Sequence, residues 1–219
     1  MIKEQLQRIG RELAAAHVRL IAVSKTQPVA AIREAYGAGQ RAFGESRPQA
    51  LLAKAAQLPA DIEWHFIGHL QTNKVKLVTG VAHTIHSGDS PKLLQALNDE
   101  ARRRHLQQRC LLQVHIAQEP SKFGFTPDSL RRLSAEGFFT TLPGLQITGL
   151  MGMATFTDDT AQIRAEFRLL RQLFTEIKQA AFPATPAFCE LSMGMSNDYR
   201  VAIEEGSTMV RIGTLLFTD

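Results

Sequence analysis

Residues 19–46 read RLIAVSKTQPVAAIREAYGAGQRAFGES, and this stretch decides the fold. It opens with an apolar, strand-like run, continues with helical spacing over 29–39 and closes on a second short run at 42–46. A strand, a helix and a strand in this order are typical of a βαβ unit, in which the two strands lie parallel and the helix crosses between them. The same alternation continues to residue 214.

The number of alternating units separates an open sheet from a closed barrel. We predict strands at 19–26, 42–46, 63–68, 83–87, 110–117, 146–153, 187–193 and 209–214. We predict helices at 2–16, 29–39, 47–57, 70–79, 90–106, 127–136, 160–181 and 197–205. Eight units favour closure, so we expect an α/β fold that is a single (β/α)8 TIM barrel, with residues 1–219 as one domain. The pattern leaves no room for a helix after the last strand, and we expect the N-terminal helix to occupy that outer position.

Composition narrows the class of protein. The chain has 219 residues, 44% of them hydrophobic, and 25 Lys plus Arg against 21 Asp plus Glu give a net charge of +4, which is typical of a globular domain. Basic residues are dispersed apart from 102–104, so no nucleic-acid partner is predicted. No apolar run approaches a membrane span and the N-terminus lacks a signal-peptide pattern, so we expect no membrane partner and a cytoplasmic location. Cys110 and Cys189 are expected to be buried free thiols.

The ends of the first three strands carry polar residues. The active site of such a barrel lies at the C-terminal ends of its strands, which is where Lys25 and Ser46 fall. Two interpretations of Lys25 stay open: a surface lysine that reaches water, or a desolvated amine able to form a Schiff base with a carbonyl. His65 and His69 could serve in acid/base chemistry, but their spacing without a third ligand predicts no metal site.

The strongest local signal is LSMGMSND at 191–198 together with RIGT at 211–214. Loops after strands seven and eight of such barrels commonly bind phosphate through backbone N–H groups, which would involve Ser192, Gly213 and Thr214. The alternative is that residues 196–198 only cap the next helix and the glycines only turn the chain. Both roles can hold at once, because a helix cap and an anion site share a helix start.

Arg211 lies on the last predicted strand and is expected to point toward the barrel mouth or interior. A buried arginine needs an acceptor, which would be either a ligand or Glu190 on the neighbouring strand. A lysine amine and a phosphate-binding loop at one end of a barrel together suggest a phosphorylated aldehyde, and pyridoxal phosphate meets both demands.

Several motifs resemble the family of pyridoxal phosphate homeostasis proteins, whose fold is similar to the N-terminal barrel of alanine racemase. The motifs are AVSKTQPVAAIREAYGAGQRAFGES (22–46), IEWHFIGHLQTNK (62–74), SKFGF (121–125), GLMGM (149–153) and LSMGMSNDYRVAIEEGSTMVRIGT (191–214). The resemblance implies that Lys25 carries pyridoxal 5'-phosphate as a Schiff base and that Arg211 faces the pyridine nitrogen. It also implies the following contacts: Ser192, Gly213 and Thr214 with the phosphate, and Met151 and Met153 with the ring.

One position departs from the family pattern. Ser46 stands where the family usually has asparagine, so we expect a hydroxyl in place of an amide contact near the cofactor. An arginine beside the pyridine nitrogen disfavours protonation there and weakens the ring as an electron sink. Racemisation also needs acid/base groups on both faces of the substrate, and a second domain supplies one of them in alanine racemase.

We therefore expect a carrier of the cofactor, without racemase activity and with no catalytic residue assigned. It would buffer or deliver pyridoxal phosphate and influence amino-acid and keto-acid balance, as a monomer, with cofactor-requiring apo-enzymes as candidate partners. The alternative is an active racemase or lyase whose second acid/base is His69 or Tyr199. A third alternative is a cofactor-free aldolase that uses Lys25 on a sugar phosphate.

Overall fold

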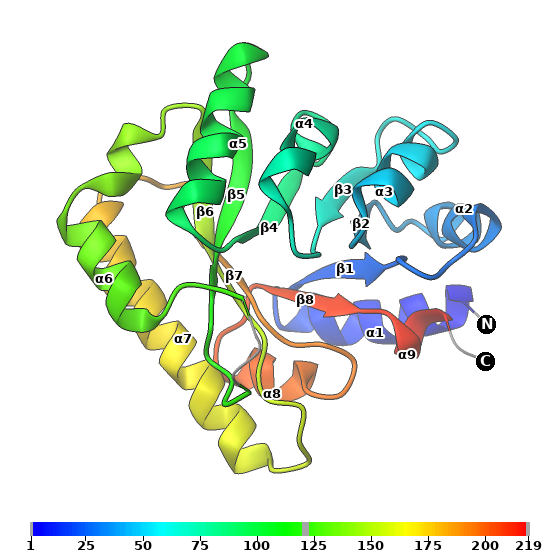
Figure 1. The fold of residues 1–219 in the computed structure, drawn as a ribbon. Coiled ribbons are helices and arrows are strands. Elements are labelled where there is room, and N and C mark those ends of the chain that lie inside the picture. Colours follow the sequence, from blue (N-terminus) through cyan, green and yellow to red (C-terminus); the bar gives the residue numbers. More distant parts are fainter. Residues whose placement is uncertain (1, 120–122, 218–219) are drawn as a thin grey trace.

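The computed structural model describes residues 2–119 and 123–217, and these form a closed barrel of eight parallel strands surrounded by helices (Figure 1). Each strand pairs with the next, and β8 pairs with β1 through Arg19 opposite Met209. The strands are β1 (Arg19–Val23), β2 (Ala42–Glu45), β3 (Glu63–Phe66), β4 (Thr84–Gly88), β5 (Gln108–Val114), β6 (Leu145–Gly152), β7 (Glu190–Ser192) and β8 (Met209–Ile212). The predicted TIM barrel is confirmed.

Helices form the outer ring of the barrel. They are α1 (Ile2–Ala15), α2 (Val29–Gly37), α3 (Pro48–Ala55), α4 (Val75–Val78), α5 (Pro91–Arg103), α6 (Pro127–Ala135), α7 (Thr160–Ala181), α8 (Tyr199–Glu204) and α9 (Thr214–Phe217), with short 3-10 helices η1 (Thr72–Lys74) and η2 (Phe138–Thr141). The expectation of no helix after the last strand is wrong, because Leu216 and Phe217 donate backbone hydrogen bonds to Gly213 and close a short helical turn. As expected, α1 packs outside the barrel, against β1, α2 and α9.

Local sequence signals account for where several helices begin. The Ser90 hydroxyl accepts a hydrogen bond from Leu93 N–H and precedes Pro91, while Thr126 does the same for Ser129 at the start of α6. Proline in the first turn costs the helix no hydrogen bond, and the capping hydroxyl satisfies an N–H group that the helix leaves free. The predicted helix over 70–79 is shorter than expected, since η1 and α4 together cover only 72–78.

The barrel interior is unusually polar. Its apolar part includes a small cluster of Ile21, Ala42 and Met209, separate from the large core between strands and helices. Ion pairs link Arg19 of β1 to Glu63 of β3 and Arg109 of β5 to Glu190 of β7. Each pair joins strands that are not neighbours, so the side chains meet inside the barrel. All four residues are the first or second residue of their strands, so the pairs lie at the N-terminal end of the barrel.

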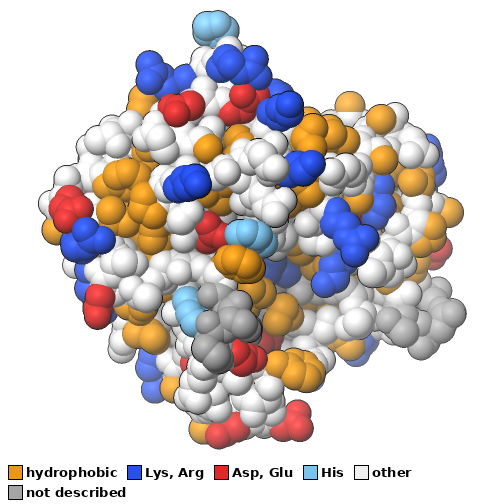
Figure 2. All heavy atoms as spheres, viewed as in Figure 1, with side chains coloured by type: hydrophobic (Ala, Val, Ile, Leu, Met, Phe, Trp, Pro, Cys, Tyr) orange, Lys and Arg blue, Asp and Glu red, His pale blue; other side chains and the backbone are white. Residues whose placement is uncertain are grey.

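The surface carries both charge signs. Figure 2 shows Lys and Arg side chains interspersed with Asp, Glu and apolar side chains over one face. Among the described helices, none is long and apolar enough to cross a membrane. Cys110 is buried as expected, whereas Cys189 is exposed, because β7 begins only at the next residue and leaves this thiol in the preceding loop.

Candidate functional site

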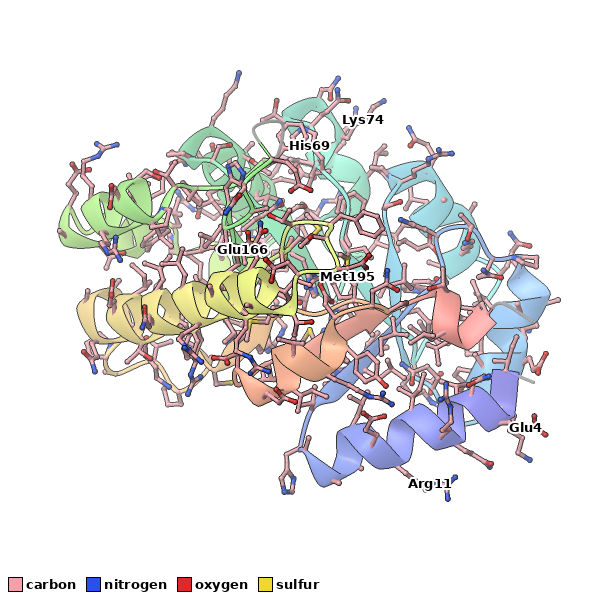
Figure 3. All side chains as sticks on the ribbon, turned by 90° about the horizontal axis from the view of Figure 1, so that it is seen from below. Glu4, Arg11, His69, Lys74, Glu166 and Met195 are labelled. Carbon is pink, nitrogen blue, oxygen red and sulfur yellow. The ribbon has the colours of Figure 1, made fainter. Side chains whose placement is uncertain are left out.

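A cavity of about 650 Å³ opens at the C-terminal ends of the strands. Its walls come from segments that follow six strands of the barrel, β1, β2, β3, β6, β7 and β8. They include Lys25, Ser46, Thr155, Ser196, Gly213 and Thr214. Glu166 of α7, labelled in Figure 3, holds the loop after β6. Its carboxylate accepts hydrogen bonds from the N–H and the hydroxyl of Thr155, both at 2.7 Å. The same view labels Met195, another cavity residue, in the loop between β7 and α8.

Lys25 lies just beyond β1 and contributes to the cavity wall. Its side chain is exposed, so the structure does not show the desolvation that would make the amine reactive by burial. The residue before it is held firmly: the Ser24 hydroxyl donates to Glu45 Oε1 at 2.6 Å, and Lys54 Nζ donates to the Ser24 carbonyl at 2.7 Å. This buried cluster fixes the point from which Lys25 projects.

The loops after β7 and β8 form another part of the cavity wall. Gly213 N–H donates to Ser196 Oγ at 3.4 Å, so the two loops are joined directly. A Cβ on Gly213 would lie 3.3 Å from both Cβ and the carbonyl oxygen of Val23, which is a tight contact, so glycine suits this position. Thr214 follows at the start of α9 and lines the cavity with Ser196. Two hydroxyl donors and nearby backbone amides suit an anionic group.

Ser192 lies one layer below the cavity. It is fully buried, is not part of the cavity wall, and accepts a hydrogen bond on Oγ from Arg211 Nη1 at 2.7 Å. Sequence reasoning gave Ser196 only a capping role, although the same reasoning allowed a helix cap and an anion site to coincide. The buried position of Ser192 could have been predicted from the period-2 alternation of side chains along a strand, because this residue ends β7 with its side chain pointing inward.

Arg211 is the buried cation of the site, at 4% exposure, and it reaches the cavity. Nη1 also donates to the Ser192 carbonyl at 2.9 Å, and Nη2 donates to the Gly152 carbonyl at 3.0 Å. The suggested pairing with Glu190 is wrong, because Glu190 binds Arg109 at the other end of the barrel. Burial lowers the pKa of Arg211 to about 10, partly offset by the charge of Asp198, so the guanidinium stays cationic at neutral pH.

Two buried histidines continue this hydrogen-bond chain into the barrel. Ser192 Oγ lies 3.2 Å from His86 Nδ1, and His86 Nε2 lies 2.8 Å from His65 Nδ1. Burial lowers the pKa of both rings well below the ordinary value, helped for His86 by the charge of Arg211. Both are therefore neutral at pH 7. Sequence analysis assigned no role to His86, although it alternates with Ile85 on β4 and so had to face inward.

The remaining candidates occupy distinct places. Met151 is buried and lies outside the cavity wall, whereas Met153 is part of it. His69 Nδ1 is 3.0 Å from Asp89 Oδ2, and its ring stacks on Phe123 with the centroids 3.6 Å apart. Ser121 and Lys122 of the SKFGF motif lie outside the described residues.

Comparisons with known proteins agree on the type of domain. The family model described as alanine racemase, N-terminal domain, matches residues 1–219. A pyridoxal phosphate homeostasis protein of Aquifex aeolicus is 41% identical over 219 residues, covering 100% of this chain and 93% of that protein. The human protein of the same name is 38% identical, covering 100% of this chain and 82% of that one.

Solved structures extend the likeness to three dimensions. PipY of Synechococcus elongatus with pyridoxal phosphate bound is 40% identical, with a TM-score of 0.89 over 99% of this chain and 100% of that one. PipY without the cofactor gives a TM-score of 0.91 at the same identity and coverage. An alanine racemase from Bartonella henselae shares the fold, with a TM-score of 0.75 at 13% identity over 58% of that chain.

Proposed function

This chain belongs to the family of pyridoxal phosphate homeostasis proteins, and from that premise we propose that it binds pyridoxal 5'-phosphate and serves the intracellular homeostasis of that cofactor. The observation that carries the proposal is the cavity between Lys25 and the joined Ser196–Thr214 wall, with the immobilised Arg211 cation at its base. An amine, an anion-binding wall and a buried cation in one cavity match the three recognisable parts of the cofactor: aldehyde, phosphate and ring nitrogen.

The residues present fit the cofactor in size and in chemistry. The cavity volume of about 650 Å³ falls within the usual range for small-molecule sites. Lys25 would hold the cofactor as a Schiff base, while Ser196, Gly213 and Thr214 would receive the phosphate. Ser192 would act through Arg211, because its buried hydroxyl and carbonyl fix the guanidinium. Ser46 would offer a hydroxyl at the cavity wall, and Met151 would support the ring from beneath Met153.

Arg211 favours a carrier over a racemase. When bound, the cofactor supplies electron-sink chemistry, which is stronger when its ring nitrogen is protonated. A guanidinium with three hydrogen bonds to Ser192 and Gly152 stays charged and cannot accept a proton, so it opposes protonation of a nitrogen placed against it. We further propose that the chain holds the cofactor in the cytoplasm as a monomer and releases it to cofactor-requiring apo-enzymes.

Ligand comparison tests the proposed phosphate wall. Equilibrium dialysis should show that the protein binds pyridoxal phosphate more tightly than pyridoxal, which lacks the phosphate. Thr214→Val should weaken binding of the phosphate form at least about tenfold, since a hydrogen bond to a charged group contributes roughly 1.5–3 kcal/mol. It should leave the binding of pyridoxal almost unaffected. Thr175→Val, on the exposed face of α7, is the matched control. Equal losses for both ligands would contradict the assignment.

Isotope exchange tests the carrier function against the racemase alternative. Loaded protein at high concentration should not exchange the α-hydrogen of a panel of amino acids with deuterated water. Exchange that is lost in Lys25→Ala would establish the racemase or lyase alternative instead.

A further inference from the structure

A second cluster of chemically active side chains lies at the opposite, N-terminal end of the barrel. Glu63 opens β3, His65 follows on the same strand, and His83 immediately precedes β4. One potential ligand atom from each residue lies within 4.8 Å of the others. We propose that Glu63, His65 and His83 form a binding site for a divalent cation of the zinc class.

His65 supplies the observation that points to a ligand. Its Nδ1 is engaged with His86 Nε2 at 2.8 Å, while its Nε2 is buried and has no hydrogen-bond partner within the part of the chain that the structure describes. An imidazole that bonds a protein group through one nitrogen and leaves the other for a metal is the usual arrangement of a histidine ligand. His83 follows the same pattern, with Nδ1 3.0 Å from Thr84 Oγ1 and Nε2 facing Glu63.

The spacing suits a small cation. Ligand atoms held about 2.0–2.1 Å from a tetrahedral zinc ion lie roughly 3.4 Å from one another. His83 Nε2 and Glu63 Oε2 are already 3.5 Å apart, so one edge of that tetrahedron is present. No separation among the three ligand atoms exceeds 4.8 Å, so none would have to close by more than about 1.4 Å. Two histidines and one carboxylate would leave a fourth position for water.

The positive charge of Arg19 opposes the binding of a cation to Glu63. Its guanidinium is paired with Glu63 Oε2, so a metal ion and Arg19 compete for the same carboxylate. Arg109 lies nearby, but its charge is balanced by Glu190, which accepts from Nη2 at 2.8 Å. Removing the Arg19 charge should therefore strengthen cation binding, an effect that a cluster held together only by ion pairs would not give.

A bound cation would also affect the hydrogen bonds of Arg211, through a chain of buried side chains. Coordination through His65 Nε2 places a proton on Nδ1, which then donates to His86 Nε2; His86 in turn donates from Nδ1 to Ser192 Oγ. Ser192 Oγ is the atom that accepts from Arg211 Nη1, so the cation would fix the tautomers of both rings and the hydroxyl below the cavity. The two ends of the barrel interior would be connected through these four side chains.

Zinc titration tests the site directly. Protein dialysed against a chelator should take up one equivalent of Zn²⁺ in competition with a zinc-binding dye. His83→Gln and Glu63→Gln should each weaken binding by at least about tenfold, and Arg19→Gln should tighten it. His105→Asn, at an exposed histidine outside the cluster, should bind like the wild type. Circular dichroism would verify that each variant is folded.

Spectroscopy of the wild-type protein keeps the test decisive if a variant fails to fold. One equivalent of Co²⁺ should give the intense visible absorption of tetrahedral coordination, and Zn²⁺ should shift the ¹⁵N resonances of His65 and His86 together. Absence of stoichiometric binding, or binding that His83→Gln leaves unchanged, would overturn the proposal.

Discussion

Replacing Lys54 with methionine should destabilise the barrel and loosen the base of Lys25. Lys54 Nζ donates to Glu45 Oε1 at 2.8 Å and to the Ser24 carbonyl at 2.7 Å. The Glu45 side chain is fully buried and that of Lys54 is 12% exposed, so the pair lies in a protein environment and not in water. Removing one partner of a buried ion pair typically costs about 3–5 kcal/mol, because the remaining charge is left uncompensated.

The geometry supports the lower end of that range. The Ser24 hydroxyl still donates to Glu45 Oε1 at 2.6 Å and partly stabilises the remaining charge, which lowers the cost. Glu45 Oε2 has no hydrogen-bond partner among residues 2–119 and 123–217, so the cost stays within the range. We expect Lys54→Met to lower the free energy of unfolding by about 3 kcal/mol, or the melting temperature by roughly 6–12 °C. Urea unfolding followed by circular dichroism measures the first quantity and a thermal scan the second.

A double variant separates charge from packing. Glu45→Gln combined with Lys54→Met removes the unpaired charge, so the double variant should be about 1–2 kcal/mol more stable than Lys54→Met alone. Lys92→Met, at an exposed position on α5, should change stability by less than about 0.5 kcal/mol. A loss below about 1 kcal/mol for Lys54→Met, or a double variant no more stable than the single one, would refute the reasoning.

Two further predictions concern the barrel. Gly149→Ala should lower the free energy of unfolding, measured in urea, by more than about 3 kcal/mol, because its Cβ would lie 1.7 Å from the Glu190 carbonyl oxygen. Gly10→Ala, in open space on α1, should instead raise the free energy of unfolding by about 0.5–1 kcal/mol. Equal effects of the two substitutions would contradict this reasoning. In chelator-treated protein, the lowered pKa values of His65 and His86 mean that the unfolded chain binds protons first as pH falls. Stability should therefore decline below about pH 6.5 by roughly 1.4 kcal/mol per pH unit for each ring, and a flat profile between pH 7 and 5 would count against it.

Sequence periodicity was sufficient to predict the barrel and the end at which its cavity lies. Strand-ending residues such as Lys25 and Thr214 could be placed at the cavity because strand order and direction alone determine that position. The alternation of side chains along β7 places Ser192 inside the barrel, beneath Arg211. Ser196 follows in the loop after this strand and lines the cavity.

Contacts inside the barrel could not be predicted from the sequence. Arg211 and Glu190 lie on adjacent strands, yet they occupy different heights in the barrel, and the tilt and register that separate them are properties of the closed sheet. The grouping of Glu63 and His65 with His83 is equally a product of strand register, since His83 comes from the loop that enters β4. Spacing along the chain suggested His69 as the neighbour of His65, but that residue lies in the loop after β3.

The central claim is that Lys25 holds the cofactor, and reductive trapping tests it most directly. Protein loaded with pyridoxal phosphate is treated with borohydride, digested and mapped by mass spectrometry, beside Lys25→Ala and the exposed control Lys92→Ala. We predict that the mass of the reduced cofactor is found on the peptide containing Lys25, unchanged in Lys92→Ala and lost in Lys25→Ala together with the visible absorbance of the loaded protein. Trapping on another lysine, or an equal yield in Lys25→Ala, would contradict the account.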